Sequence, residues 1–219
     1  MRLNERAERF VRVNIHHMKI GKRSFSLILL VPVLLGAFWL VSTSRAATET
    51  PEYAVVKKDG KIEIRDYPEL MVATAPMKEN MDNSFMTLFR FITGANEEKQ
   101  KIAMTSPVLI RSEKEKKTMS FIVPKETVEK GVPKPTGELV TVSKIQAARF
   151  VTLRFSGKRS SETEVKAVAA LQTWMNEQKV EAKGQPVFAY YDPPWTPTFM
   201  RRNEVMFCIE KPLETESAK

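Results

Sequence analysis

Residues 53–76 read YAVVKKDGKIEIRDYPELMVATAP and contain three short apolar-rich runs in succession. The first two runs, 53–58 and 61–66, alternate between apolar and polar residues, as a half-buried strand does. The Asp-Gly pair at 59–60 between them is typical of the two-residue turn of a β-hairpin. The third run covers residues 69–75. The stretch therefore predicts three consecutive strands, of which the first two pair as an antiparallel hairpin.

The segment that follows predicts a helix. Phe85, Leu88, Phe89 and Ile92 recur at the spacing of one helical face, and Gly94 is expected to end the helix. Two strands around a charged turn come next, and then a connector punctuated by prolines. These strands are predicted over residues 101–111 and 118–123.

The second half of the chain repeats this order of elements, with a helix in the corresponding place. The sequence SETE at 161–164 has the form of a capping box and predicts a helix to about residue 179. Single helices flanked by short strands favour an antiparallel α+β domain over a doubly wound parallel sheet. The strands expected around the second helix cover residues 138–143, 148–155, 187–191 and 203–210.

Composition excludes several kinds of catalytic and metal site. Cys208 is the only cysteine of the 219 residues, which excludes an intramolecular disulfide framework and a zinc site built from a Cys cluster. Both histidines, His16 and His17, precede the predicted strands. Histidine-dependent triads and the common His-ligated metal sites are therefore excluded from the folded region. We predict no catalytic residue.

The net charge of +9 is concentrated at the beginning of the chain. Residues 1–46 carry +6 of it and residues 47–219 only +3. A folded region with mixed charges near neutrality is an ordinary solvated surface, so we expect no nucleic-acid partner.

An uncharged apolar segment precedes the predicted domain. Residues 25–41 read FSLILLVPVLLGAFWLV, and the uncharged interval between Arg23 and Arg45 covers residues 24–44. As a helix this interval is about 31 Å long, enough to cross a hydrocarbon core of ~30 Å. The preceding basic residues are expected to stay in the cytoplasm while the following chain is exported. We therefore predict a basic cytoplasmic segment (1–24), a hydrophobic helix that is a signal sequence or membrane anchor (25–44), and a polar linker (45–52).

Two fates of the apolar segment remain open. Left uncleaved, it anchors the domain to the membrane, outside the cytoplasm. Ser44-Arg45-Ala46 has the small–x–small form of a cleavage site, and cleavage before Ala47 makes the domain periplasmic or secreted. Translation from Met18 instead of Met1 leaves an ordinary secretory signal.

Three segments together resemble the SOUL haem-binding family. They are YAVVKKDGKIEIRDYPELMVATAP at 53–76, FMTLFRFITGANEEKQKIAMTSPV at 85–108 and YYDPPWTPTFMRRNEV at 190–205. The resemblance spans about residues 50–212. It implies a single domain over 53–212, a distorted antiparallel β-barrel of two βαββ-type repeats with two flanking helices, followed by a polar tail at 213–219.

The resemblance also implies binding of haem or another tetrapyrrole in an apolar groove beside the first helix and the late proline-rich loop. Phe85 and Phe89 would provide apolar contact, and Arg90 a charge for a propionate. Trp195 would offer its face to the flat ring. The candidate ligand-binding residues are Phe85, Met86, Phe89, Arg90, Tyr191 and Trp195.

Structural roles remain open for these residues. Phe85 and Phe89 can pack on the sheet, Arg90 can be a solvated charge, and the loop with Trp195 can close the end of the barrel. The metal ligand is also open, because the predicted domain has no histidine for haem iron. The alternatives are Cys208, a Met such as Met86 or Met104, a Tyr, or binding without an iron–protein bond.

The expected function is carriage, buffering or sensing of a tetrapyrrole, with membrane contact through the N-terminal segment. A binding module for another amphipathic ligand or a protein partner is the alternative. A small hydrolase or tetrapyrrole-modifying enzyme on the same fold is a third.

Overall fold

The computed structural model describes residues 48–77, 81–113 and 116–210. Two helices, α2 (Met81–Ile92) and α4 (Ser161–Glu177), interrupt a series of strands, and a short helix α3 (Lys125–Lys130) and a 3-10 turn η1 (Thr198–Met200) lie in connections. The strands are β1 (Ala54–Asp59), β2 (Ile62–Tyr67), β3 (Leu70–Met77), β4 (Val108–Glu113), β5 (Lys116–Ile122), β6 (Thr141–Ile145), β7 (Ala148–Phe155), β8 (Val187–Tyr190) and β9 (Asn203–Ile209).

The nine strands form one antiparallel sheet in the order β1-β2-β7-β9-β8-β4-β5-β3-β6. This order confirms the predicted α+β class and the internal repeat. The units β2-β3-α2-β4-β5 and β6-β7-α4-β8-β9 pair in the same way, so that β3 pairs with β5 as β7 pairs with β9. β4 and β8 join the units at the centre. The helices, which begin at Met81 and Ser161, occupy corresponding places in the two units.

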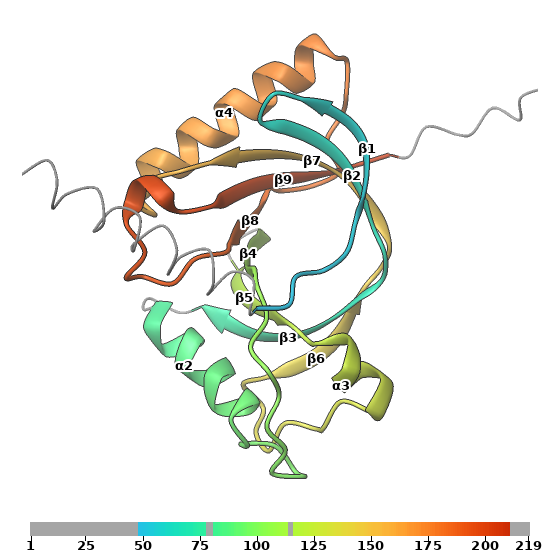
Figure 1. The fold of residues 1–219 in the computed structure, drawn as a ribbon, viewed down its shortest axis with the longest axis vertical. Helices are drawn as coiled ribbons and strands as arrows, with labels where there is room; N and C mark the ends of the chain where they lie inside the picture. Colours follow the sequence, from blue (N-terminus) through green and yellow to red (C-terminus); the bar gives the residue numbers. More distant parts are fainter. Residues whose placement is uncertain (1–47, 78–80, 114–115, 211–219) are drawn as a thin grey trace, which may run out of the picture. The chain divides into compact units, whose positions relative to one another are not determined.

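The predicted barrel closure is wrong. Closing the sheet would require β6 to pair with β1 or β2, but in the part of the chain that is described β6 pairs only with β3 and β1 only with β2. All six residues of β1 are exposed, so this strand has no buried side chain with which to join a barrel wall. The sheet curves instead, with α2 and α4 outside it (Figure 1).

The predicted first hairpin is present, with its turn one residue later than expected. Asp59 pairs with Ile62, so the two-residue loop is Gly60-Lys61. Gly60 has φ +55°, which a residue without a side chain adopts readily. The turn is tied to α4, because the indole Nε1 of Trp174 donates to Asp59 Oδ2 at 2.8 Å.

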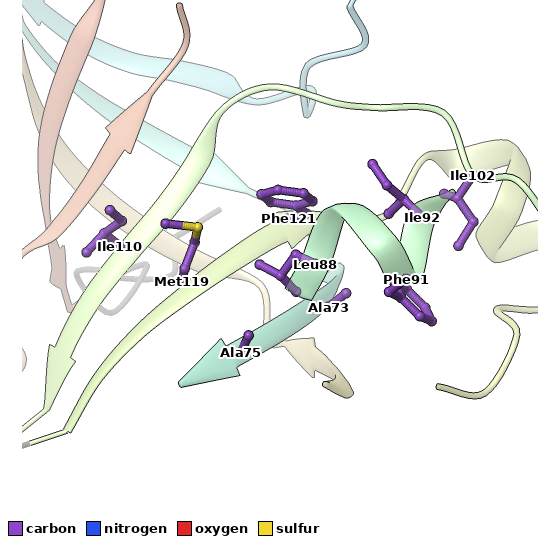
Figure 2. Close-up of a cluster of buried hydrophobic side chains, with 9 residues drawn as sticks. All are labelled: Ala73, Ala75, Leu88, Phe91, Ile92, Ile102, Ile110, Met119 and Phe121. Carbon is purple, nitrogen blue, oxygen red and sulfur yellow. The ribbon is translucent and has the colours of Figure 1, made fainter. Parts of the chain in front are cut away.

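Three apolar clusters cover the two faces of the sheet, and two of them hold the helices to it. Leu88 and Phe91 of α2 are buried against β3 and β5, with Phe121 at the centre (Figure 2). Leu171 and Trp174 of α4 are buried against β7 and β9. A third cluster covers the face of the sheet turned away from both helices, which we call the inner face. Along β2, alternation sends Ile62 and Ile64 towards α4 and sends Glu63, Arg65 and Tyr67 to the inner face.

Three further details differ from the sequence-based expectation. The strand predicted from residue 101 begins only at Val108, because Pro107 has no N–H to donate to a ladder. The proline-rich connector contains α3, with an exposed ion pair between Glu126 and Lys130. The capping box of α4 is formed by Ser160 and Thr163, one residue before the predicted position.

No helix within the described ranges of 48–210 is long and apolar enough to cross a bilayer. The predicted cytoplasmic segment (1–24) and the predicted hydrophobic helix (25–44) lie outside the described residues.

Candidate functional site

Helix α2 carries aromatic residues on its exposed side as well as on its buried side. The rings of Phe85 and Phe89 are stacked, with centroids 6.0 Å apart and an interplanar angle of 13°. Phe85 also meets Phe121 edge-on at 5.3 Å, so it belongs partly to the core. Phe89 and Met86 are 40% and 43% exposed, and Arg90 is exposed. Phe85 therefore packs partly on the sheet, which was the alternative to ligand binding, whereas Met86 and Phe89 present apolar surface to solvent.

The loop between β8 and β9 also exposes aromatic surface. Trp195 is 83% exposed, and Phe199 in η1 is 72% exposed. Arg201 braces this loop internally: its guanidinium donates to the carbonyl of Thr196 at 2.8 Å and to the carbonyl of Pro194. These hydrogen bonds hold the loop in one conformation, and its indole is exposed to solvent. A ligand that stacks on this flat surface would therefore lose little binding free energy in ordering the loop.

The structure brings four of the six predicted residues together on one helix. Trp195 is on a separate loop, and in the described residues no ring contact or hydrogen bond joins it to α2. A single groove shared by α2 and the loop therefore stays a prediction.

Tyr191, the sixth predicted residue, belongs to a buried polar cluster on the inner face. Arg65 forms a two-pronged ion pair with Glu204, with Nη1–Oε2 at 2.8 Å and Nη2–Oε1 at 3.2 Å. The Tyr191 hydroxyl donates to Glu204 Oε2 at 3.0 Å, and Arg202 Nη2 donates to Oε1 at 2.8 Å. Tyr67 accepts from Arg65 at 3.1 Å. We call these five residues the Glu204 network.

Charge and burial fix the protonation states in this network. Burial alone would raise the pKa of Glu204, but the hydrogen bonds and charges of Arg65 and Arg202 outweigh it and lower the pKa below 4.5. Burial and the Glu204 charge raise the pKa of Tyr191, and burial raises that of Tyr67 to about 12. Glu204 is therefore charged, and the Tyr191 phenol keeps the proton that it donates. This arrangement gives Tyr191 a structural role.

Three cavities lie along the sheet. One, of about 860 Å³, is bordered by hydroxyl side chains of β3, β5 and β6 and by Arg111. A second, of only about 30 Å³, is lined by Tyr67 and Tyr191. A third, of about 440 Å³, lies beside the β1–β2 turn, with Glu204 in its wall. Of the six predicted residues only Tyr191 lines any of these three.

Comparison with protein families identifies the domain. The sequence matches the family described as SOUL heme-binding protein over residues 48–208, most of the chain. The chain belongs to the SOUL family. A search of curated protein sequences found no match.

Solved structures resemble this SOUL domain in fold. The EcmrR C-terminal domain aligns over 73% of this chain and 99% of its own, with TM-score 0.53 and 16% identity. A hydrolase from Listeria innocua aligns over 71% of this chain and 94% of its own, with TM-score 0.50 and 11% identity. At these identities the likeness shows the shared fold alone.

The residues of this SOUL domain fit a tetrapyrrole ring better than they fit its iron. Exposed apolar side chains on α2 and an indole in solvent suit a flat ring. Within residues 48–77, 81–113 and 116–210 there is no histidine, and no group of three His, Cys, Asp or Glu could hold a metal. Cys208 is half-buried against the inner-face cluster, and Met104 packs in the α2 cluster. Both have the structural surroundings of core residues, whereas Met86 is 43% exposed on α2 and stays a candidate ligand for the iron.

Two features of this region were not predicted. Phe199 lies in the proline-rich loop quoted above but was not chosen as a candidate. An aromatic residue so close to Trp195 in such a loop is a recognisable signal of further aromatic surface. Arg65 was not a candidate residue, yet it is 3% exposed and binds Glu204. Alternation with Tyr67 was the only sign that its side chain turns inward.

Proposed function

We propose that this SOUL domain binds haem or a related tetrapyrrole noncovalently and carries, buffers or senses it. Family membership over residues 48–208 carries the proposal. The exposed side of α2 and the braced loop with Trp195 supply apolar and aromatic surface for such a ring.

The interaction needs no bond to iron. Burying ~400 Å² of porphyrin surface contributes about 10 kcal/mol before the cost of association, at ~25 cal/mol per Å². That cost removes several kcal/mol and leaves an affinity on the order of micromolar. Arg90, exposed on α2, can pair with a propionate at the edge of the ring.

An absorbance titration of the purified full chain with haemin and with iron-free protoporphyrin tests the proposal. We expect a weak, broad Soret shift with haemin, without the spectrum of a His-ligated low-spin complex, and similar affinity for the iron-free ring. A strong preference for haemin would contradict ring-based binding and point to a protein ligand for the iron.

Trp195→Ala is expected to weaken porphyrin binding by about 1–2 kcal/mol, roughly five- to thirtyfold, because it removes a ring that stacks on the ligand. The indole is 83% exposed, so the melting temperature should change little. Leu139→Ala is the control, since Leu139 is 58% exposed outside this loop and should leave the affinity unchanged. Normal affinity in Trp195→Ala would exclude this loop from the site.

We also propose that residues 25–44 direct the domain across a membrane, either as a signal sequence or as an anchor. The support is the uncharged apolar interval after a basic segment. A reporter fused after Lys219 that is active only when translocated should be active, and replacing two central leucines of 25–44 with Lys should abolish its activity. A reporter that works only in the cytoplasm would refute export. N-terminal sequencing then separates cleavage before Ala47 from retention.

A further inference from the structure

The cavity beside the β1–β2 turn has walls rich in basic side chains. It has a volume of about 440 Å³, within the range of small-molecule sites. Strands β1, β2, β7 and β9 border it, whereas α2 packs on β3 and β5 at the other end of the sheet. Its charged lining residues are Lys58, Lys61, Glu63, Arg65, Arg154, Arg202 and Glu204. With five bases and two acids, the lining has a net charge of +3.

The acids of this cavity are already neutralised. Glu204 is shared by Arg65 and Arg202, at 2.8 Å in each case. Glu63 is shared by Lys58 at 3.0 Å and Arg65 at 2.8 Å. Three cations thus surround two carboxylates and leave an excess of one positive charge. The side chains of Arg65 and Arg202 are 4% and 23% exposed, whereas that of Lys58 is 66% exposed.

Two further basic side chains line the same cavity and form no ion pair with a carboxylate among the described residues. They are Lys61 and Arg154, and both are exposed. Their backbones are joined, because the Arg154 N–H donates to the Lys61 carbonyl at 3.0 Å. The turn and the end of β7 therefore hold these two side chains at one edge of the cavity. An anion placed there would meet flexible cations at the edge and fixed ones in the wall.

We propose that this cavity binds a small, multiply charged oxyanion, a molecule whose phosphate or carboxylate groups place two or more negative charges close together. One negative charge would leave most of the lining charge of +3 uncompensated, so a multivalent anion fits best. Lys61 and Arg154 are exposed and can donate to such oxygens, and the Arg154 guanidinium suits them by its planar shape. Arg65 and Arg202 are bonded to Glu204 and contribute charge from the wall. The ring of Tyr53, which lies 4.3 Å from the Arg65 guanidinium in the same lining, provides apolar contact for the body of the ligand.

Isothermal titration of the full chain at low salt with inorganic pyrophosphate and with citrate tests this site. We expect at least one probe to bind with a dissociation constant below about 1 mM and to bind less tightly as salt is added. The tighter probe tells whether phosphate or carboxylate oxygens are preferred. No heat from either probe up to about 10 mM would overturn the proposal.

Variants of the cavity edge make the test specific. Lys61→Gln/Arg154→Gln should bind the probe at least about tenfold more weakly, because it removes two charges from the site. It should fold normally, since both side chains are exposed and lack an ion pair. Glu63→Gln should bind more tightly, because it adds to the excess positive charge. Lys117→Gln, at an exposed position of β5 outside this lining, should bind as the wild type does. Unchanged affinity in the double variant, or equal weakening by Lys117→Gln, would overturn the site.

Discussion

Glu204→Gln is expected to lower the free energy of unfolding by about 3–5 kcal/mol, because it leaves the buried Arg65 guanidinium without its principal counter-charge. Glu204 is fully buried, and the Arg65 side chain is only 4% exposed. For a domain of this size such a loss corresponds to a melting temperature lower by about 6–20 °C. Chemical denaturation with an unchanged m-value would assign the change to stability.

Asp66→Asn is the matched control for this variant. Asp66 forms a similar two-pronged ion pair with Arg149, at 2.7 and 2.8 Å, but these side chains are 27% and 18% exposed. The same acid-to-amide change should therefore cost less, about 1–2 kcal/mol. Equal losses in the two variants would show that burial does not set the importance of Glu204.

The dependence of stability on pH provides a second readout of Glu204. Its pKa lies below the ordinary value of 4.5, so its charged form stabilises the fold fully above pH 4.5. This contribution is lost as the pH falls from 4.5 through the lower pKa of the folded state. Glu204→Gln has no such contribution to lose, and its stability should fall less steeply below pH 4.5. Parallel acid profiles for the two proteins would contradict the proposed charge state.

The order of the elements was predictable because local signals agreed. Alternating runs around Asp59-Gly60 gave the first hairpin, and the spacing of Phe85, Leu88 and Ile92 gave α2. These signals depend on residues close in the sequence, so a period of two or of about 3.6 residues indicates a strand or a helix without knowledge of distant contacts. The internal repeat followed from the order of the elements.

Features that depend on distant contacts were not predictable in the same way. Closure of a barrel depends on whether β6 meets β1, which lies far from it in the sequence. Arg65 meets its partner Glu204 across 139 positions. A short charged helix such as α3 has no apolar periodicity to reveal it.

The candidate site shows the same division. Periodicity placed Phe85, Met86, Phe89 and Arg90 on one helix, but it did not show which of the aromatic residues face solvent. Tyr191 was selected through its place in a family motif, and its contact with Glu204 emerged only from the register of β8 and β9. The sequence thus predicted the helix and the loop as elements, whereas the burial and contacts of their individual side chains required the packing.

The proposal that the exposed side of α2 binds the tetrapyrrole can be tested directly, because Phe89 and Phe91 differ in burial on the same helix. Phe91 is 1% exposed in the same apolar cluster as Phe121, whereas Phe89 is 40% exposed. Phe91→Ala should lower the free energy of unfolding by about 3–5 kcal/mol, since it removes a ring from a packed core and leaves a cavity. The loss should be seen in thermal and chemical denaturation, as for Glu204→Gln.

Phe89→Ala should show the opposite pattern. Its stability should fall by about 1 kcal/mol or less, because much of the ring already contacts water. Its porphyrin affinity should fall roughly fivefold, since the ring contributes about 1 kcal/mol of contact to the ligand. Both variants are titrated with iron-free protoporphyrin at a temperature where each is fully folded. If folded Phe91→Ala loses as much affinity as Phe89→Ala, the whole helix shapes the site through its packing. If Phe89→Ala binds like the wild type, the exposed side of α2 is not the tetrapyrrole surface.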